Sequence, residues 1–395
     1  MLIAGAGICG LATALAAARA GRRVKLLESR PAFYETGAGL QLGPHAVKVL
    51  QALGLADALA NQAFAPPSIR VMAGRRTQPV AEIPLGAHAR SRYGAPYWCL
   101  HRQDLHRTLA HAVGAEPRIE VTFGFRAHAV AEEGKRVRIH DRTGGDAVGV
   151  GLIGADGLWS AVRDAVLPEG STAVEAVFSG LTAWRAVLPM EKVPGPKVEG
   201  VELWMLPEAH AVLYPISGGK ALNLIVVLSE TLLEEGFDVA GEQEALLAAA
   251  PWPDRLGTIL ERVPGWLRWA LYKRPETAPW TRGRILIAGD AAHPLLPFLA
   301  QGAAMALEDA WAIGSALSSG STDFEALWRA VAARRRPRAD RVVKASARNA
   351  WSFHLSGPLG QARDLALSTL GGKRLLSAYD WLYGYSEVDA PRFAL

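Results

Sequence analysis

At 395 residues, half of them hydrophobic, the chain is long for a single core, so two domains are expected; no run approaches the roughly 18–20 apolar residues that a membrane span needs. The net charge of +5 comes from residues 334–348, where seven basic side chains face only Asp340, a local +6 that leaves −1 elsewhere. We interpret this stretch as a solvated helix, and no interleaved aromatic pattern suggests nucleic acid.

The first elements predict a βαβ unit that binds a dinucleotide. A short apolar run, 2–4, ends at Gly5, a small-residue helix follows, and a second apolar run ends at Glu28. In this order Gly5 permits the turn, Gly7 lets the backbone approach a pyrophosphate, and Gly10 lets helix and strand pack closely. The phosphates would lie at the helix N-terminus. Glu28 can accept both ribose hydroxyls of an adenosine and would repel a 2′-phosphate, so the site favours FAD or NAD over NADP.

The next hundred residues continue the same domain. A glycine-rich segment, 37–44, precedes a short helix, and a longer helix is predicted over residues 100–113. Strands over residues 137–140 and 148–154 lead to the pattern DGxxSxxR at residues 156–163. Its aspartate would order the loop, and its arginine would lock the loop by ion pairing. A simple turn with a helix cap is an equally good interpretation of this motif alone.

Between residues 175 and 230 the apolar residues alternate with period two, which indicates β-strands. His210 and Tyr214 fall on one face of a strand, and a Ser-Gly-Gly turn joins this strand to the apolar run 222–228. The pattern predicts a hairpin. We expect an antiparallel sheet that is inserted into the βαβ domain and forms a second layer over its cofactor.

A third motif returns the chain to the first domain. The pair Gly289-Asp290 follows an apolar run at the carboxyl end of a predicted strand, where ligands bind in open α/β sheets. Asp290 can accept hydrogen bonds from ribityl hydroxyls. A helix then begins at Gly302, and its free N–H groups at Gly302 and Ala303 could face the N1/C2=O edge of a flavin. They would stabilise the reduced, anionic flavin by ~1–2 kcal/mol.

The two cysteines and ten histidines decide whether disulfides or a metal site are expected. Cys9 and Cys99 make neither a disulfide framework nor a metal cluster, and the histidines lack metal-ligand spacing, so no metal site is expected. No signal-peptide pattern is visible. We therefore expect a protein of the reducing cytoplasm.

Over almost the whole chain, the three motifs resemble those of the single-component FAD-dependent aromatic monooxygenases, which include salicylate hydroxylase and p-hydroxybenzoate hydroxylase. The segments 37–42, 183–186, 210–215 and 354–359 are most similar to the salicylate hydroxylase branch. The resemblance implies that FAD, bound tightly but not covalently, is reduced by NAD(P)H. Oxygen then adds at flavin C4a, and the hydroperoxide transfers its distal oxygen to an electron-rich ring. The lack of a second GxGxxG fits transient binding of NAD(P)H.

The resemblance also implies the architecture, an α/β fold. A Rossmann-like FAD-binding domain of the GR2 type would contain an inserted antiparallel β-sheet domain for the substrate and end in C-terminal helices. The expected FAD-binding parts are 1–70, 98–174 with the DG motif, and 276–350 with the GD motif and a long helix. The substrate sheet would take 71–97 and 175–275. The helical segment 351–395 has no predicted role.

The FAD contacts that the resemblance implies come from every part of the first domain: Gly5, Gly7, Gly10, Glu28, Gly39, Gln41, Arg102, Asp156, Asp290, Gly302 and Ala303. Arg102 has a physical argument of its own, because a guanidinium beside the pyrophosphate makes bidentate contact; a surface arginine at a helix start is the alternative. At His45 the family usually has asparagine. This histidine would lie near the flavin edge and contact substrate, or be a harmless replacement.

Oxygen transfer to a phenol is easier once the phenol has lost its proton, so a nearby base would help. His210 and Tyr214 share the sheet face predicted to form the pocket floor, and histidine titrates near neutrality; a core histidine is the alternative. Pro297 and Phe298 begin the loop beside the flavin and would shape the pocket. Arg185 would pair with a substrate carboxylate or form a structural ion pair.

The resulting hypothesis is an enzyme that hydroxylates a small aromatic acid or phenol with NAD(P)H and O₂, as a monomer or homodimer. Two alternatives remain open from the sequence. One is a monooxygenase of the same fold that acts on a polyketide, purine or quinone. The other is an FAD-dependent reductase or oxidase that transfers no oxygen.

Overall fold

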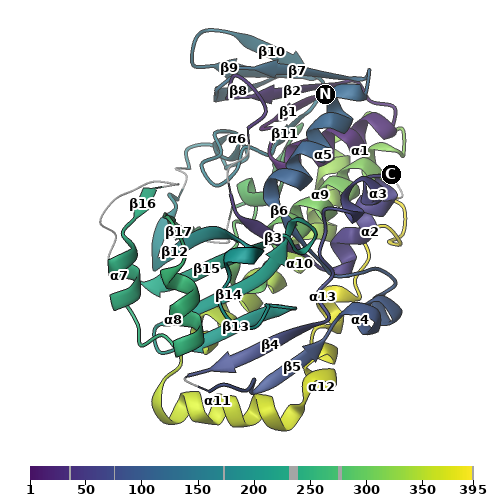
Figure 1. Ribbon diagram of the computed structural model, residues 1–395. Coiled ribbons are helices and arrows are strands. Elements are labelled where there is room, and N and C mark those ends of the chain that lie inside the picture. The colour runs from purple at the N-terminus through teal and green to yellow at the C-terminus, as the bar shows by residue number, and fades with distance from the viewer. Residues whose placement is uncertain (35–36, 75, 172–173, 231–238, 275–277, 394–395) are drawn as a thin grey trace.

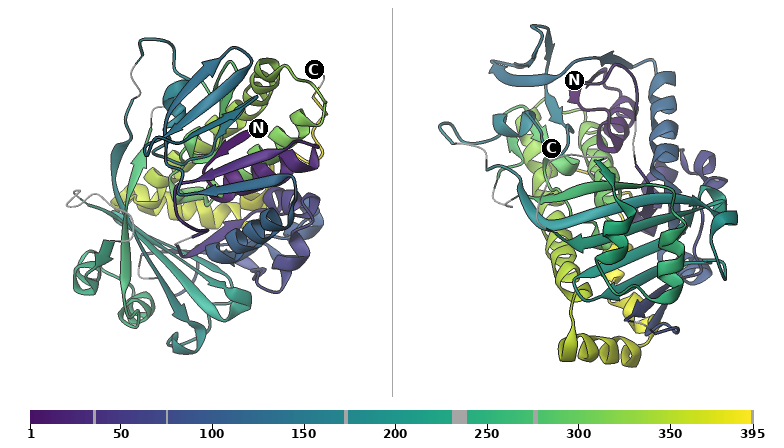
Figure 2. Two further views of the ribbon diagram at one scale, coloured as in Figure 1. Left: turned by 90° about the horizontal axis from the view of Figure 1, so that it is seen from above. Right: turned by 60° about the vertical axis from the view of Figure 1, so that its left-hand side comes forward.

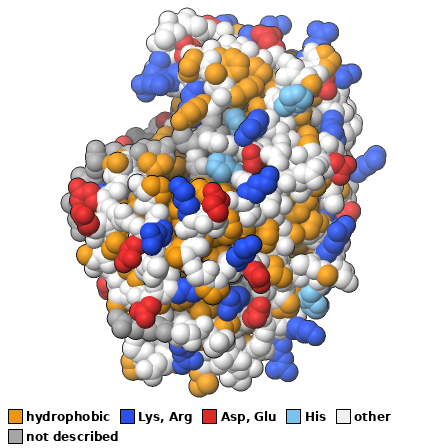
Figure 3. Space-filling model, in the orientation of Figure 1, with side chains coloured by type: hydrophobic (Ala, Val, Ile, Leu, Met, Phe, Trp, Pro, Cys, Tyr) orange, Lys and Arg blue, Asp and Glu red, His pale blue; other side chains and the backbone are white. Residues whose placement is uncertain are grey.

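The computed structural model describes residues 1–34, 37–74, 76–171, 174–230, 239–274 and 278–393. Figure 1 shows an upper part, which contains the N-terminus, and a lower part built on a large sheet. Lys/Arg and Asp/Glu side chains are interspersed over the face shown in Figure 3. Of the helices in the described residues, none is long and apolar enough to cross a membrane.

The upper part is built on a six-stranded sheet in the order β18-β19-β11-β1-β2-β7. Its central strands β19, β11, β1, β2 and β7 run parallel, and β18 is antiparallel to β19. The strands are β1 (Leu2–Ala4), β2 (Val24–Glu28), β7 (Ile119–Phe123), β11 (Leu152–Gly154), β18 (Thr281–Arg282) and β19 (Ile285–Ile287). Strands β1, β11 and β19 are wholly buried, as expected where helices cover both faces of a parallel sheet. The predicted βαβ unit is confirmed.

Three helices pack around this sheet: α1 (Ile8–Arg19), α5 (Arg102–Ala115) and α9 (Gly302–Leu317). Helix α1 contacts both α5 and α9. The shorter elements are β3 (Gly39–Leu42), α2 (Pro44–Ala52), α3 (Ala56–Ala60), α4 (Gly86–Tyr93), β6 (Trp98–His101) and α6 (Val162–Ala165). Strand β3 pairs with β6 and so brings the glycine-rich segment beside the start of α5.

One strand expectation was wrong. Residues 148–154 form two strands in different sheets, because β10 (Asp146–Gly149) joins β9 (Arg136–Asp141) and β8 (Ala127–Glu133), whereas β11 joins the parallel sheet. Between them the backbone passes very close to its neighbours. A Cβ at Gly149 would lie 2.7 Å from Leu2, and a Cβ at Gly151 would lie 3.0 Å from Phe324.

The lower part is an eight-stranded sheet in the order β16-β17-β12-β15-β14-β13-β4-β5. Its strands are β4 (Ser68–Ala73), β5 (Ala81–Pro84), β12 (Val177–Pro189), β13 (Val201–Leu206), β14 (Ala209–Ile216), β15 (Ala221–Ser229), β16 (Val239–Gly241) and β17 (Trp266–Lys273). The predicted hairpin β14–β15 is confirmed. The sheet is antiparallel except that β13 and β4 are parallel.

The period-two pattern assigns the two faces of this sheet correctly. Ala211 and Leu213 of β14 belong to a core that includes residues of α7 (Gln243–Ala248) and α8 (Asp254–Glu261), the helices on the outer face in Figure 2. His210 and Val212 alternate with them and line a cavity on the other face. An α/β domain with an inserted, mainly antiparallel sheet is therefore confirmed.

The C-terminal residues run from the upper part to the lower part. Helix α10 (Phe324–Phe353) descends past the large sheet to α11 (Gly357–Leu370) below it (Figure 1). Helix α12 (Gly372–Ser377) then packs against β5 and α13 (Asp380–Tyr383) against α2, so the chain returns toward the upper part. The interpretation of residues 334–348 as a solvated helix was wrong for one face of α10, since Arg335 and Arg338 are buried. The domain boundaries stay predictions, and the boundary between 275 and 276 lies outside the described residues.

Candidate functional site

The glycines after β1 divide into two kinds. Gly5 has φ +93°, and its Cβ would lie 2.5 Å from the Ala155 carbonyl oxygen; a Cβ at Gly10 would lie 1.8 Å from the Gly5 oxygen. The close packing expected at Gly10 is thus confirmed. A Cβ at Gly7 would meet nothing within 4 Å. Gly7 is the N-cap of α1 and no side chain caps this end, so the open space adjoins first-turn N–H groups that lack partners within the helix.

Glu28 ends β2 next to this turn. Its carboxylate accepts hydrogen bonds from the backbone N–H of Ala6 at 2.8 Å and of Arg30 at 2.8 Å. The Ser29 hydroxyl also donates to Oε1 at 3.1 Å, so these bonds fix the direction of the side chain and leave an acceptor position at Oε2. Such a carboxylate is suited to a ribose hydroxyl.

The DG loop after β11 is stabilised by hydrogen bonds between its own residues. The Asp156 carboxylate accepts from the Ser160 hydroxyl at 2.5 Å and from the Ala161 N–H at 2.9 Å. Burial raises the pKa of Asp156 despite these bonds. Arg163 donates to the Ala291 carbonyl at 2.6 Å, so it ties the DG loop to the GD loop through a backbone acceptor and not through the expected ion pair.

The GD loop after β19 is positioned by Asp309 of α9. The Asp309 carboxylate accepts from the Gly289 N–H at 3.0 Å and from His293 Nε2 at 2.5 Å. Burial alone would raise the pKa of Asp309, but His293 and Arg335 outweigh it and lower that pKa. Asp309 correspondingly raises the pKa of His293 against the effect of burial. The neighbouring Asp290 is exposed, and its side chain extends from a rigidly held turn.

A buried ion cluster behind this loop joins α9, α10 and the C-terminal residues. Arg338 makes two 2.7 Å bonds to the Glu308 carboxylate, and Arg335 lies 2.7 Å from Glu308, 2.8 Å from Asp309 and 3.4 Å from Glu387. Burial opposes the charge on Glu308, but Arg335 and Arg338 lower its pKa to about 2. The cluster therefore ties α9 to α10 and to the C-terminal residues.

The N-terminus of α9 is also open. Gln301 is its N-cap without a side-chain cap, and a Cβ at Gly302 would meet nothing within 4 Å. The N–H groups at Gly302 and Ala303 are therefore first-turn donors without helical partners. Gly39 lies against Tyr214 and Asn223, where a Cβ would be 2.6 and 2.8 Å from their side chains.

Two further predicted FAD contacts lie at the β3–β6 pair. The Gln41 Oε1 accepts from the Tyr97 hydroxyl at 2.6 Å, and Gln41 lines the cavity described below. The Arg102 N–H donates to the Ala38 carbonyl at 3.0 Å, and the Arg102 side chain runs beside Gly37. Arg102 begins α5, the helix that packs against α1.

The residues present fit FAD. Strands β1, β2, β11 and β19 are parallel, so the turns after them, which carry Gly7, Glu28, Asp156 and Asp290, all lie along one edge of the sheet. Two uncapped helix N-termini supply donors for anionic groups, and two carboxylates supply acceptors for hydroxyls. Within the described residues no group of His, Cys, Asp and Glu could hold a metal ion.

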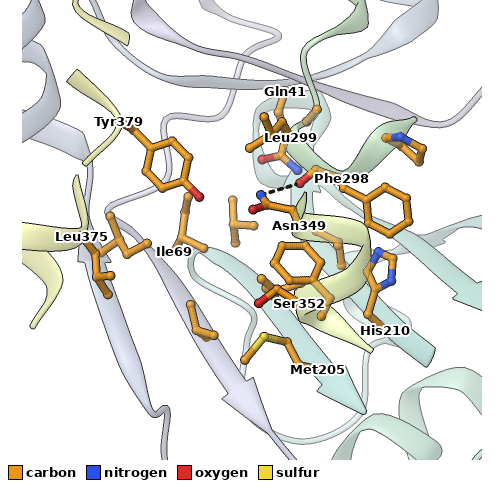
Figure 4. A pocket seen from close by; sticks show the side chains of 18 of the residues that line it. Gln41, Ile69, Met205, His210, Phe298, Leu299, Asn349, Ser352, Leu375 and Tyr379 are labelled. Atoms are coloured by element: carbon orange, nitrogen blue, oxygen red, sulfur yellow. Dashed lines mark hydrogen bonds between the residues drawn. The ribbon is translucent and has the colours of Figure 1, made fainter. Parts of the chain in front are cut away.

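A cavity of about 210 Å³ lies between the large sheet and the C-terminal helices (Figure 4). Its walls are mainly aliphatic and aromatic, and Asn349 donates to the Phe298 carbonyl at 3.3 Å across one side. Of the described residues that line it, none is Lys, Arg, Asp or Glu. The polar side chains in the wall are Gln41, Tyr97, His210, Asn349, Ser352, Tyr379 and Tyr383.

Three of the six predicted catalytic and substrate residues line this cavity: His210, Pro297 and Phe298. The other three lie outside its lining. Tyr214 is buried against Gly39, and burial raises its pKa. Arg185 lies over the Trp269 ring at 3.8 Å. His45 is buried beside Gln301, with Nε2 2.9 Å from Gln301 Oε1, and burial lowers its pKa to about 4.

His210 has the most distinctive environment. Only 2% of it is exposed, its ring centroid is 5.0 Å from that of Phe298, and its Nδ1 is 2.9 Å from Nε2 of His354. Burial, with a smaller effect of His354, lowers the pKa of His210. It is therefore neutral near pH 7 and can accept a proton from a group in the cavity.

Sequence reasoning missed the contribution of the C-terminal segment. Ser352, Phe353, Leu375, Tyr379 and Tyr383 all line the cavity. No local pattern marks these residues, because the fold brings them to the large sheet from far along the chain. For His354 the only signal was its place in a segment that resembles the salicylate hydroxylase branch.

The sequence is similar to a known protein family and to enzymes with assigned activities. The family described as FAD binding domain matches residues 1–346. The 3-amino-4-hydroxybenzoate 2-monooxygenase PtnB3 of Streptomyces platensis is 34% identical over 98% of this chain and 96% of its own. The 3-hydroxybenzoate 6-hydroxylase of Klebsiella oxytoca is 32% identical with the same coverage.

Solved structures agree on the fold. The salicylate hydroxylase substrate complex matches with a TM-score of 0.83 at 22% identity, over 98% of this chain and 95% of that one. Klebsiella pneumoniae HpxO complexed with FAD and uric acid matches with a TM-score of 0.83 at 23% identity, over 95% of each chain. The chain therefore belongs to the FAD-dependent aromatic monooxygenases and is an oxidoreductase of that family.

Proposed function

We propose that the protein hydroxylates a small phenolic compound with NAD(P)H and O₂. The proposal rests on a mainly apolar cavity in which His210, neutral near pH 7, lies beside the loop that leads to the open N-terminus of α9. The relatives named for hydroxybenzoates support a substrate of this size. FAD, once bound and reduced by NAD(P)H, supplies the activated oxygen.

The residues of the chain would divide the remaining work. His210 accepts the proton of the phenol hydroxyl and so raises the electron density of the ring. Pro297, Phe298 and the aliphatic wall hold the ring and exclude water. The N-terminus of α9 stabilises negative charge on the reduced cofactor by ~1–2 kcal/mol.

The cavity wall favours recognition of the phenol over recognition of a carboxylate. Since none of its described lining residues is Lys or Arg, an acidic substituent would be bound by neutral donors such as Asn349, Ser352 and Tyr379. Arg185, the predicted carboxylate partner, lies outside the lining and over Trp269. Phenols with and without an acidic group therefore both belong in the substrate panel.

The experiment is a product screen with the purified protein. We expect yellow protein, NADH or NADPH oxidation that rises with a cognate phenol, and one atom from ¹⁸O₂ in the product by mass spectrometry. Oxidation that is independent of every phenol, with no labelled product, would contradict the proposal and favour the reductase or oxidase alternative. If labelled product forms only from a purine, quinone or polyketide, the result would favour a monooxygenase of the same fold with one of those substrates.

A substitution at the predicted base refines the test. His210→Asn should lower kcat on the order of 100-fold with unchanged FAD content, because His210 contacts substrate and not the dinucleotide turns. Tyr214→Phe is the matched control on the same strand, and its hydroxyl lies outside the cavity lining. Equal kcat in His210→Asn and wild type would contradict the role of His210 as a base and favour a purely structural role in the core.

Assembly and compartment stay predictions. The chain would act as a monomer or homodimer in the cytoplasm. Cys9 and Cys99 are buried and free, as a reducing compartment would allow. Sedimentation of the FAD-loaded protein would decide between monomer and homodimer.

A further inference from the structure

The contact between His210 and His354 joins a buried site to the surface. His210, on β14, lines the apolar cavity, and its Nδ1 lies 2.9 Å from Nε2 of His354, with ring centroids 5.1 Å apart. His354 is the C-cap of α10 and is only partly buried. The two rings thus come from elements 144 positions apart in the sequence.

His354 also lines a second, open depression on the molecule. This depression is formed by Ser179, Gly180 and Ser229 on the sheet side and by Trp351, Leu355 and Leu359 around the end of α10. Trp351 and Leu359 are 64% and 62% exposed, so the depression is open to solvent. One histidine faces the cavity and the other faces water.

The pair carries one shared proton in its hydrogen bond. An N–H of one imidazole must meet a lone pair of the other, so at most one of the two rings can be protonated while the bond is formed. Burial lowers the pKa of both rings, to about 4 for His354. A proton would therefore not rest on either ring at pH 7.

The charged groups near the two histidines do not alter their neutral state at pH 7. Glu208, in the β13–β14 turn, donates its backbone N–H to the His354 carbonyl at 3.4 Å. Arg363 of α11 donates to the carbonyls of Ser352 and Phe353 and pairs with Asp364. In the part of the chain that the structure describes, no carboxylate is hydrogen-bonded or ion-paired to either ring.

We propose that His354 is a positioning residue that relays the substrate proton between His210 and solvent. The phenol O–H bond breaks as an N–H bond forms at His210 Nε2. The His210 Nδ1–H bond breaks as an N–H bond forms at His354 Nε2, and the His354 Nδ1 proton leaves to water in the depression. The reverse transfer restores both tautomers and returns a proton to the product.

The relay rests on the proposed function, and its test follows proton transfer without turnover. The FAD-loaded enzyme, without NAD(P)H, is saturated with 4-nitrophenol, whose phenolate absorbs visible light, and the pH is jumped in a stopped-flow instrument. In His354→Gln we expect the same final phenolate fraction, because the side chain still hydrogen-bonds His210. The approach to that fraction should slow on the order of 100-fold.

Chemical rescue separates a relay from a purely structural contact. His354→Ala opens a space toward the depression, so added imidazole should restore the fast phase in this variant and not in His354→Gln. Leu359→Ala, on the rim of the depression, is the control and should keep the wild-type rate. Wild-type rates in His354→Gln, or no rescue of His354→Ala, would overturn the relay alone. Failure of 4-nitrophenol to bind wild-type protein would contradict the proposed function and the relay with it.

Discussion

Burial and local charge give the histidines of this protein different protonation states. His45 is fully buried, and burial outweighs the nearby Glu308 and lowers its pKa to about 4. His293 is also buried, yet Asp309 at 2.5 Å raises its pKa. Near pH 7, His45 is therefore neutral, whereas Asp309 favours the charged form of His293.

The first prediction concerns His45 and pH. The folded-state pKa of His45 is below its ordinary 6.5, so protonation favours the unfolded chain, and stability falls as the pH drops below 6.5. Between pH 7 and pH 5 this residue alone should remove about 2 kcal/mol from the free energy of unfolding. His45→Asn should lose that much less over the same interval in urea unfolding. His88→Asn, at an exposed position, is the control, and an equal pH dependence in His45→Asn would contradict the assignment.

The second prediction concerns Asp290. Asp290→Ala should weaken FAD binding by at least about tenfold, the effect of losing hydrogen bonds to a charged acceptor, because its exposed carboxylate extends from the rigid GD turn. The melting temperature of the apoprotein should stay the same. Asp57→Ala, an exposed acid on α3, is the matched control. Unchanged FAD affinity in Asp290→Ala, measured by fluorescence titration, would remove Asp290 from the site.

At the scale of elements, α9 uses two glycines for opposite purposes. A Cβ at Gly302 would meet nothing within 4 Å, whereas a Cβ at Gly314 would lie 2.6 Å from the Ala16 side chain of α1. The first glycine leaves room for a ligand at the N-terminus, and the second permits close packing of two helices.

The third prediction separates these purposes. Gly314→Ala should destabilise the apoprotein by about 1–3 kcal/mol, the usual effect of overpacking. Gly302→Ala should leave the apoprotein melting temperature unchanged or slightly higher and lower the affinity for FAD. Thermal unfolding of both apoproteins and flavin titration check this pair. Loss of stability in Gly302→Ala with normal FAD affinity would contradict the assignment of Gly302 to the FAD site.

The sequence predicted those elements whose signals are local. The glycine spacing gave the βαβ turn, and period two gave both faces of β14, because each depends on neighbouring residues only. A single strand was predicted over residues 148–154, and its division into β10 and β11 was missed because Leu2 and Phe324, which pack against Gly149 and Gly151, lie far away in the sequence. Arg335 and Arg338 looked solvated because their partners Glu308 and Glu387 lie on other segments.

At the scale of the whole molecule, the substrate cavity is assembled from distant segments. Gln41, His210, Phe298 and Tyr379 reach it from four different parts of the chain. Sequence patterns placed His210 and Phe298 there through strand periodicity and family resemblance. They could not place Tyr379, because the turn after α11 directs the last helices back to the sheet.

The fourth prediction tests the attachment of this C-terminal segment. Glu387 is 2% exposed and lies 3.4 Å from Arg335 and 3.3 Å from Arg334. Glu387→Gln should lower the free energy of unfolding by about 1–3 kcal/mol, since it leaves buried charge less well paired. It should also weaken phenol binding while FAD content stays normal, because the segment carries Tyr379 and Tyr383. Asp389→Asn, which removes an exposed pair with Lys48, is the control and should change stability little.

The strand order of the parallel sheet has a consequence for biosynthesis. The edge that would hold the dinucleotide is completed by β19 and the start of α9, which are made long after β1 and β2. A polypeptide that ends at residue 280 contains the glycine turn and Glu28. It lacks Asp290 and the free N–H groups at the N-terminus of α9. If Asp290 and the α9 donors bind FAD as predicted, FAD binding requires about three quarters of the protein to have been synthesised, and shorter translation products should be colourless.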